Sequence, residues 1–460
     1  MSTDWQTVRI GDLGKVITGK TPSTAISENF GGPYPFITIP DLDDRREITT
    51  SARTLSELGA HAMRSCRLPS DAVMMSCIAT VGKCGITTKE SFTNQQINSL
   101  ICKDGIDPRF VYYSFTQLGK ALEAAGGGGS VYTNVSKSRF EAIEIRLPPL
   151  KEQRSIAEML ARLDDKIALN HRINQTLEAM AQAIFKSWFV DFDPVKAKIA
   201  AIEQGEDPLR AAMCAISGKT DAELDQMPRE HHNQLAASAA LFPDAMEESE
   251  LGSIPKGWSF RQIAQFGEVV CGKTPAKSNP GYFGLGTPFI KIPDMHNNVY
   301  VTQPSEQLTV QGVASQPKKT IPPGSICVSC IATVGKVILV HQPSQTNQQI
   351  NSIIPRRLEY SFYLYFQMLE KQQVFFDLAS GGSATLNMNT SIFSKVETLL
   401  PEDGVIIKFS ELISPVFSQI LANQKQADNL AEIRDSLLPK LLSGELRIPD
   451  TERILEEVWP

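Results

Sequence analysis

The chain repeats itself at a fixed distance of 253 residues, and this repeat limits its fold more than any other feature. Three of the shared segments are "GKTP", "SCIATVGK" and "TNQQINS", which begin at Gly19, Ser76 and Thr93 and return 253 residues later. Matches at one unchanged distance over about 145 residues indicate a duplicated domain rather than scattered short motifs. Each copy has about 150 residues, which is close to the usual size of a domain.

Short apolar runs separated by turns predict corresponding strands in the two copies. The expected strands are 15–18, 35–39, 72–82, 97–102 and 142–148 in the first copy, and 268–271, 288–292, 325–340, 350–354 and 396–401 in the second. A helix is expected before the last strand, over 107–125 and over 358–379. The fold class is therefore α+β, with two duplicated mixed α/β domains rather than a parallel βαβ array.

Both copies match the G-x-x-x-x-G-K-[ST] motif of phosphate loops, over 14–21 and 267–274. A phosphate loop requires a helix that begins at the Lys-Thr pair and directs its positive end at the phosphates. Here proline follows each threonine, and the next residues show no helical periodicity. We therefore expect no nucleotide hydrolysis. Since the chain shows no other catalytic motif or cofactor fingerprint, it is predicted to be non-catalytic and to need no cofactor.

The eight cysteines show no framework spacing, which predicts reduced thiols and a cytoplasmic location. Cys327 and Cys330 have the spacing of half a zinc site, but no second pair accompanies them, and Met74 stands at the matching position of Cys327. Buried apolar positions are the favoured interpretation, so no metal is expected. No membrane is expected either, because no apolar run approaches ~20 residues and the N-terminus lacks signal-peptide character.

The net charge of −6 is distributed unevenly. Residues 1–150 and 254–403 carry +1 and +3, whereas residues 191–253 carry −8. The repeats are therefore mildly basic, and the acidic segment between them accounts for more than the whole deficit. This distribution weakly supports a polyanionic partner for the repeats.

A long heptad pattern follows each repeat. Its seam positions are Ile156, Leu160, Leu163, Ile167, Asn170, Asn174, Leu177, Ala181, Ile184 and Trp188, and then Ile413, Val416, Ile420, Asn423, Ala427, Leu430, Arg434, Leu437 and Leu441. Two helices that pair with each other are favoured, with Asn170 and Asn423 fixing their register, although helices lying on their own domains fit the spacing nearly as well. Pro415 and Pro439 are expected to shorten or kink the second helix.

Paired helices in a tandem repeat are most simply related by an approximate two-fold axis, which makes them antiparallel. A helix of ~35 residues measures roughly 50 Å. DNA half-sites read from one face lie about one helical turn apart, ~34 Å, or multiples of it. The rod is therefore long enough to hold two DNA-reading domains at such a distance.

The segments that follow the repeats resemble a known family. "LPPLKEQRSIAEMLARLDDKIALNHRINQ", "ELGSIPKGW" and "LLPKLLSGELRI", in this order, are similar to the specificity subunit of type I restriction-modification systems. The resemblance implies two target recognition domains for a split DNA target, separated by spacer helices that dock two methyltransferase subunits; it leaves open whether a restriction translocase joins. One departure concerns Glu152 and Gln153, since the second copy has Val405 and Ile406 there, and the two docking surfaces need not be equivalent.

The resemblance divides the chain into six parts. They are target recognition domain 1 at 1–150, spacer helix 1 at 151–190, an acidic linker at 191–253, target recognition domain 2 at 254–402, spacer helix 2 at 403–445 and a tail at 446–460. The expected partners are double-stranded DNA and the methyltransferase subunits. A duplicated protein-binding scaffold without a DNA role is the alternative.

Candidate DNA contacts fall into shared and divergent positions. Shared residues are candidates for phosphate contacts; they are Lys20, Lys83, Ser130, Asn134, Lys273, Lys336, Ser383 and Asn387. A plain loop or turn role is an equal alternative for all of them except Lys83 and Lys336, whose identical surroundings slightly favour a phosphate contact. Base readers are expected where the copies diverge, because the halves of a split target usually differ. These candidates are Arg45, Arg46, Tyr132, Lys137, Lys318, Lys319, Thr385 and Asn389. The amides at 94–96 and 347–349 could read adenine, but their identity in both copies favours hydrogen bonding within a turn.

Overall fold

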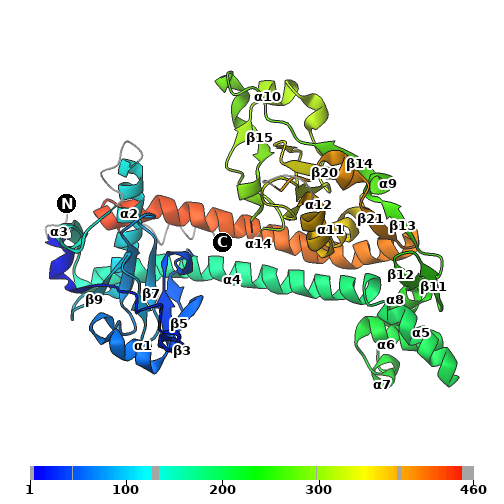
Figure 1. Cartoon of the computed structure of the whole chain (residues 1–460), viewed down its shortest axis with the longest axis horizontal. Helices are drawn as coiled ribbons and strands as arrows, with labels where there is room; N and C mark the ends of the chain where they lie inside the picture. Colours follow the sequence, from blue (N-terminus) through cyan, green and yellow to red (C-terminus); the bar gives the residue numbers. More distant parts are fainter. Residues whose placement is uncertain (1–4, 44, 127–133, 297, 381–385, 448–460) are drawn as a thin grey trace. The chain divides into compact units, whose positions relative to one another are not determined.

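The computed structural model describes residues 5–43, 45–126, 134–296, 298–380 and 386–447. The chain forms two compact units (Figure 1). Unit 1 comprises residues 1–169 and 426–460, and unit 2 comprises residues 170–425. Each unit combines one copy of the repeat with a segment of each of two long helices, α4 (Leu150–Phe189) and α14 (Asp403–Ser443).

Unit 1 contains three sheets around its copy of the repeat. The first has the order β2 (Gly14–Thr18), β9 (Ile97–Cys102), β6 (Val73–Ser76), β7 (Cys84–Thr87) and β4 (Glu47–Ile48). The second has the order β5 (Arg53–Leu55), β3 (Phe30–Ile37) and β8 (Phe92–Thr93), and the third pairs β1 (Gln6–Arg9) with β10 (Glu144–Leu147). Its helices are α1 (Glu57–Ala62), α2 (Pro108–Gly126) and α3 (Lys137–Ala142).

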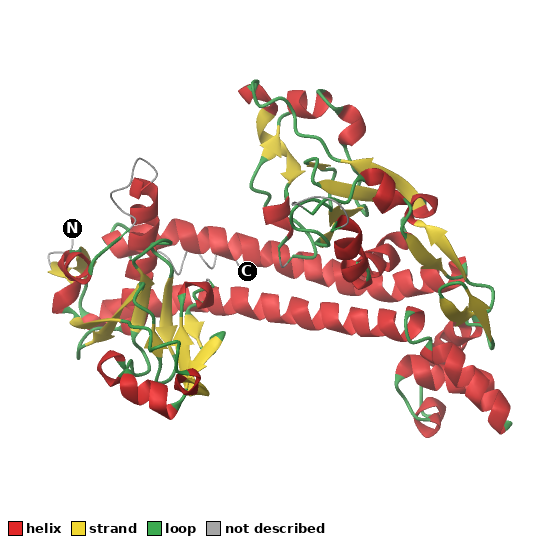
Figure 2. Cartoon of the chain, viewed as in Figure 1, coloured by secondary structure: helices red, strands yellow, loops and turns green. Residues whose placement is uncertain are grey.

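Unit 2 repeats this topology strand for strand, with one difference. Its first sheet has the order β14 (Gly267–Cys271), β20 (Ile350–Pro355), β17 (Ile326–Ser329) and β18 (Val337–Leu339). The second has the order β16 (Gln307–Leu308), β15 (Phe283–Ile290) and β19 (Gln345–Thr346). The third pairs β13 (Ser259–Gln262) with β21 (Glu397–Leu400). Where unit 1 has β4, unit 2 has a single parallel bridge between Tyr300 and Leu339. The mixture of helices and strands is visible in Figure 2. The α+β class with two duplicated domains is confirmed.

Three expected elements are interrupted in the structure. The run 72–82 was expected to be one strand, but β6 ends at Ser76, and residues 77–83 form a loop before β7; the run 325–340 is divided in the same way. The chain turns there because Ala79 and Ala332 have φ of 65° and 63°. The helix expected at 358–379 is two helices, α11 (Tyr360–Glu370) and α12 (Gln372–Ala379). The remaining short helices of the second repeat are α9 (Ile263–Phe266), α10 (Val310–Ala314) and α13 (Thr390–Ser394).

The two long helices pair along the predicted seam. In unit 2, Asn170 donates to the backbone oxygen of Asn423 at 3.3 Å, and Asn174 donates to that of Ile420 at 2.9 Å. From the first contact to the second, the residue number rises along α4 and falls along α14, so the two segments are antiparallel. In unit 1, Leu160 and Leu437 belong to one apolar core. The same segments also pack on the domain of their own unit, so both interpretations of the heptad pattern hold.

The prolines do not shorten α14, contrary to the expectation. The helix continues through Pro415 and Pro439 over 41 residues. Both prolines lie on its exposed face, where water can bind the carbonyl groups that lose their helical partner. Buried residues on the opposite face, such as Phe417 and Leu437, hold the helix in place.

By length and composition, α14 would be able to cross a membrane, and it is the one such helix in the described part of the chain. This corrects the expectation that no apolar run is long enough. Its apolar residues include Ile413, Phe417 and Ile420, which are at most 1% exposed in the core of unit 2.

The acidic segment between the repeats is helical. It contains α5 (Asp193–Gln204), α6 (Pro208–Ser217), α7 (Asp221–Asp225) and α8 (Arg229–Ala240), followed by a hairpin of β11 (Met246–Ser249) and β12 (Gly252–Pro255). Met213, Leu224 and Ala239 form a small core of their own. Val195 and Phe242 anchor the segment in the main core of unit 2.

Candidate nucleic-acid interface

The shared "GKTP" and "TNQQINS" segments lie against each other in unit 1. The backbone amide of Gly19 donates to the oxygen of Ile97 at 3.1 Å, and that of Lys20 donates to Thr93 at 3.0 Å. A Cβ at position 19 would lie 2.2 Å from the backbone oxygen of Asn94, so only glycine allows this approach. Two residues further on, the Thr21 hydroxyl donates to the side chain of Gln95 at 2.7 Å.

The amides of the "NQQ" turn mostly bond to each other. Asn94 donates to the side-chain oxygen of Gln96 at 2.9 Å, and its own oxygen accepts from the Gln96 backbone at 3.1 Å. Asn94 is 9% exposed. Hydrogen bonding within the turn is therefore confirmed for Asn94 and Gln96. Gln95 is exposed, which leaves its amide nitrogen accessible from outside.

The shared "SCIATVGK" segment forms a strained loop beside this turn. Ala79 has φ of 65°, a left-handed conformation that costs a non-glycine residue about 1 kcal/mol or more. Ser76 closes the loop, because its hydroxyl donates to Thr80 at 2.6 Å and accepts from the Lys83 amide at 2.9 Å. Residues held in such conformations are concentrated at functional sites, where the surrounding structure enforces them.

A fourth shared segment completes the cluster. The Cys77 amide donates to Gln96 at 2.7 Å, and the Val135 amide donates to Cys77 at 2.8 Å. Ile78 forms a single antiparallel bridge with Asn134. The loop Ser76–Lys83 is thereby held between the "NQQ" turn and the start of the segment after the Gly-Ser stretch.

The same cluster occurs in unit 2. Lys273 donates to Thr346 at 2.9 Å, Cys330 donates to Gln349 at 2.8 Å, and Met388 donates to Cys330 at 2.8 Å. Ala332 has φ of 63°, and Ile331 forms a single bridge with Asn387. We call each of these four-segment arrangements a turn cluster. The two turn clusters share these backbone hydrogen bonds and a left-handed alanine.

The turn clusters exclude the phosphate-loop interpretation. No helix begins at Lys20 or Lys273; both follow a strand and continue as irregular chain. The amides of Gly19 and Lys20 donate to carbonyl oxygens of the same domain, so they cannot bind phosphate. The expectation of no nucleotide site at this motif is confirmed.

The predicted phosphate-contact lysines lie at the turn clusters. Lys20 and Lys273 are exposed at the "GKTP" turns, and Lys83 and Lys336 are half-buried at the ends of the strained loops. Asn134 and Asn387 are exposed at the bridges to these loops. The shared residues Ser130 and Ser383 and the divergent residues Tyr132 and Thr385 lie outside the described residues.

The divergent candidates are placed differently from one another. Arg45 is exposed but forms an ion pair with Asp43 at 2.7 Å, and Lys137 lies 3.5 Å from Glu141. Lys318 is exposed, whereas the Lys319 ammonium donates to the Cys271 backbone at 2.8 Å. Asn389 begins α13 and accepts from the Ile392 amide at 2.9 Å, so its oxygen is occupied by the helix.

Arg46 is held by helix α4 rather than by the domain surface. Its guanidinium donates to Asp165 at 2.7 Å and lies 3.8 Å from Asp164, and its side chain is 9% exposed. Tyr113 donates to Asp164 at 2.5 Å. Burial and the neighbouring Asp164 carboxylate raise the pKa of Tyr113, so its hydroxyl keeps the proton that it donates. This placement favours a structural role for Arg46.

Sequence reasoning missed two features of the site. The exposed amides of Gln95 and Gln348 were included with their buried neighbours, and only the fold separates them. The left-handed alanines Ala79 and Ala332 have no sequence signal of their own, since glycine is the usual residue there. The identity of "SCIATVGK" in both copies was the available hint.

Glu152 and Gln153 at the start of α4 and the cysteine pair Cys327 and Cys330 also have structural roles. Glu152 accepts from the Trp5 indole at 3.1 Å, and Gln153 is 1% exposed and bonds to the backbone of unit 1. Cys327 and Cys330 point into different apolar cores, so their thiols cannot bind a common metal ion. Burial raises the pKa of each thiol to about 12.

Comparison with known proteins gives consistent results. The model of a family described as type I restriction modification DNA specificity domain matches residues 2–179 and 255–427. The specificity subunit of type I restriction enzyme HindI from Haemophilus influenzae is 45% identical over 328 residues, covering 68% of this chain and 72% of that protein. The MjaIX specificity subunit from Methanocaldococcus jannaschii is 26% identical over 457 residues, covering 97% and 94%. Among solved structures, the S subunit of a type I restriction-modification system from M. genitalium has the same fold, with a TM-score of 0.53 at 13% identity, covering 96% and 97%.

Proposed function

Because the chain belongs to the family of type I restriction-modification specificity subunits, it is the non-catalytic DNA-recognition subunit of a multisubunit complex, and we propose that each of its two domains reads one half of a bipartite target. Target recognition domain 1 comprises residues 1–150 and target recognition domain 2 comprises residues 254–402. The spacer helices at 151–190 and 403–445 lie between the two target recognition domains in this proposal. Residues 446–460 are assigned to a C-terminal tail. The subunit acts in the cytoplasm.

The main support for two equivalent DNA-reading domains is the turn cluster. The turn cluster is built twice, with the same hydrogen bonds and the same left-handed alanine in each copy. A strained loop persists only where the surrounding structure enforces it, and here two copies preserve it independently. The strained loop ends in a lysine and lies beside a turn with an exposed glutamine amide, Gln95 or Gln348, and this combination is suited to contact a duplex.

We assign phosphate contacts to the shared lysines and base contacts to the divergent surface. Lys20, Lys83, Lys273 and Lys336 would hold each domain in the same position on the backbone of the duplex. The half-targets differ, so the readers of their bases differ as well. Arg45, Lys137, Lys318 and the residues of the two Gly-Ser stretches remain candidates for that role, and Arg46 is left out because α4 holds it.

Two methyltransferase subunits are the proposed protein partners, and a restriction subunit completes the complex where one is present. The acidic linker at 191–253 would contact partner protein rather than DNA, because its charge of −8 repels phosphates. Replacing the exposed Glu203, Glu206 and Glu230 by glutamine tests this assignment. It should weaken partner binding, and weaker DNA binding at constant partner occupancy would contradict it.

A domain exchange tests the whole proposal. Residues 1–150 are replaced by the corresponding domain of a related specificity subunit, and the methylated sequence is determined in cells that also express the methyltransferase. One half of the target should change while the other half and the spacer stay the same. A change in both halves would refute independent reading, and the absence of any salt-dependent DNA binding by the complex would favour the protein-binding scaffold instead.

A further inference from the structure

A buried ionic network attaches the first domain to the helices of unit 1. Asp164 on α4 accepts from Arg434 on α14 at 2.8 Å and from Tyr113 on α2 at 2.5 Å. Arg46 approaches the same carboxylate at 3.8 Å. Asp164 is 15% exposed, and Arg46 is 9% exposed. One carboxylate therefore joins the domain, α4 and α14.

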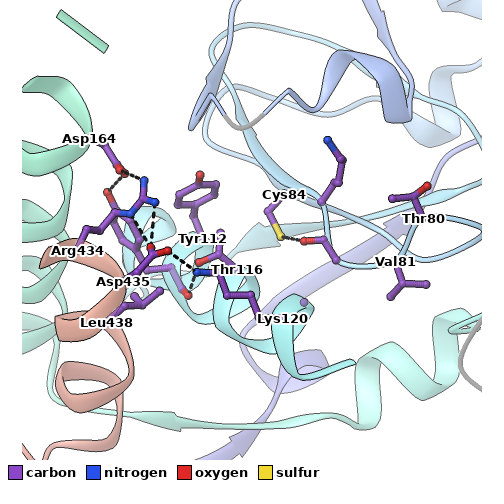
Figure 3. A pocket seen from close by; sticks show the side chains of 14 residues that line it. Thr80, Val81, Cys84, Tyr112, Thr116, Lys120, Asp164, Arg434, Asp435 and Leu438 are labelled. Carbon is purple, nitrogen blue, oxygen red and sulfur yellow. Dashed lines mark hydrogen bonds and ion pairs between the residues drawn. The ribbon is translucent and has the colours of Figure 1, made fainter. Parts of the chain in front are cut away.

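One hydrogen-bond donor of this network has no partner in the described part of the chain. The Nε atom of Arg46 is buried and has no hydrogen-bond partner among the described residues. A cavity of about 320 Å³ adjoins the network, and Asp164, Arg434 and Lys120 are among its lining residues (Figure 3). Buried ionic groups with an imperfect set of partners contribute little net stability, and an adjoining cavity removes packing contacts.

Unit 2 builds the matching attachment from apolar groups. The positions 253 residues away from Arg46, Tyr113 and Asp164 are Val299, Phe366 and Phe417, and Arg434 corresponds to Ala181. All four are at most 7% exposed and belong to one apolar core. The rings of Phe366 and Phe417 lie edge to face with their centroids 5.7 Å apart. Close-packed aromatic contacts of this kind have no charge to screen and no unsatisfied donor.

The ionic network is also connected to the turn cluster of its domain. Lys83 and Thr80, from the strained loop, line the same cavity as Asp164 and Arg434. The loop packs directly on α2, since a Cβ on Gly82 would lie 2.6 Å from the Cα of Gly119. Tyr113, which donates to Asp164, lies on that same helix. A change at Asp164 can therefore reach the loop through α2.

We propose that Asp164, Arg46 and Arg434 are positioning residues that form an adjustable ionic attachment of the first DNA-reading domain, beside its apolar contacts with α4 and α14, whereas the second domain has an aromatic core at the matching positions. The network sets the position of the strained loop Ser76–Lys83 relative to α4 and α14. When it opens, the apolar contacts with α4 and α14 still hold the first domain, and the domain can shift on them as it binds DNA. This inference rests on the proposed function only for its effect on DNA reading; the difference between the two attachments stands on the contacts themselves.

Amide hydrogen exchange on the full chain tests the attachment without DNA. Asp164→Asn keeps the shape of the side chain but removes one acceptor and the charge between two guanidinium groups. Opening of α2 should increase at least tenfold, while the matched helix α11 of unit 2 stays unchanged. Asp164→Glu should restore part of the protection, and Glu158→Gln, an exposed carboxylate on the same helix, should leave both helices unchanged. Equal exchange in α2 of the wild type and Asp164→Asn, or an equal increase in α2 and α11, would overturn the proposal.

The wild-type chain supplies a second test that needs no variant. Raising NaCl from 0.1 to 0.6 M should increase exchange in α2 more than in α11, because α2 is attached through the charged network at Asp164, whereas the matching positions of unit 2 are apolar and its ion pair between Arg357 and Asp403 is exposed. In the complex with its methyltransferase, Asp164→Asn should reduce discrimination against mismatches in one half-target by several-fold and leave the other half unaffected. If Asp164→Asn altered amide exchange in α2 but left the discrimination against mismatches unchanged, the network would have only a structural role, and its proposed role in positioning the loop would be refuted. If the wild-type complex showed no half-target preference at all, the proposed function would fail, and the exchange results would still decide the attachment.

Discussion

The side-chain amide of Asn423 on α14 donates a hydrogen bond of 2.9 Å to the side-chain oxygen of Asn174 on α4. Asn423 in turn accepts from Gln419 at 2.7 Å, and its backbone oxygen accepts from Asn170 at 3.3 Å. Polar residues in an apolar seam fix the register of two helices, because any shift would leave them buried without partners. The register of the helix pair in unit 2 therefore depends on a small group of amides.

Replacing Asn423 by alanine should destabilise unit 2 by about 1 kcal/mol, since the buried Asn423 side chain loses its hydrogen bonds with the partly buried Asn174 and the exposed Gln419. Calorimetry of the full chain would measure the shift of the corresponding transition. Gln182→Ala, at an exposed position of α4, is the matched control and should change little. Equal effects of both variants would show that the amide contacts do not fix the helices.

Lengthening both long helices by one heptad should lengthen the unread spacer of the DNA target. Duplicating residues 167–173 in α4 and 420–426 in α14 keeps the seam in phase and adds ~10 Å, about three base pairs. The methylated motif recovered from cells would contain the same half-targets at a larger separation. Four-residue insertions at the same places rotate the seam by about 40° and should impair assembly instead. An active heptad variant with the original spacer would refute the role of the helices as the spacer.

Lys83→Gln and Lys336→Gln should each weaken DNA binding for all sequences alike, because both lysines are assigned to phosphate. The slope of log affinity against log salt concentration should fall by about 0.9 per lost contact. Titration of the complex with target and non-target duplexes at several salt concentrations measures both quantities. Lys219→Gln in the acidic linker serves as the control. A change in base preference would show that these lysines contact bases rather than phosphates.

Alkylation at pH 8 should leave Cys77, Cys327 and Cys330 intact long after Cys271 has reacted. Burial raises the pKa of Cys77 to about 11 and those of Cys327 and Cys330 to about 12. The thiolate is the reacting form, so these thiols should react at least about 100-fold more slowly than an open one, and each unit of pH above 8 should raise their rates about tenfold while the fold holds. Mass spectrometry of peptides gives the rates, with alkylation of the unfolded chain as the control. Rapid modification of Cys330 in the folded chain would contradict the core placement.

The sequence by itself determined the duplication and the α+β class and favoured the helix pairing, because each rests on a periodicity within the chain. Repeated segments at one distance must fold alike, and the apolar 4-3 spacing that includes Asn170 and Asn423 needs a partner surface. The interruption of the strand expected at 72–82 was not predicted. The left-handed conformation of Ala79 depends on neighbours such as Gln96 and Val135, which are remote in sequence. The continuity of α14 through Pro415 likewise follows from packing on the opposite face.

Only the tertiary structure decided what the individual polar residues do. Arg46 looked like a base reader because it is basic and differs between the copies, yet Asp165 and Asp164 hold it from more than 100 residues away. Gln95 and Gln96 are adjacent and chemically identical, but the turn exposes one amide and occupies the other. Identity in two copies indicates that a position matters, and burial together with the available partners determines whether it acts on DNA or on the fold.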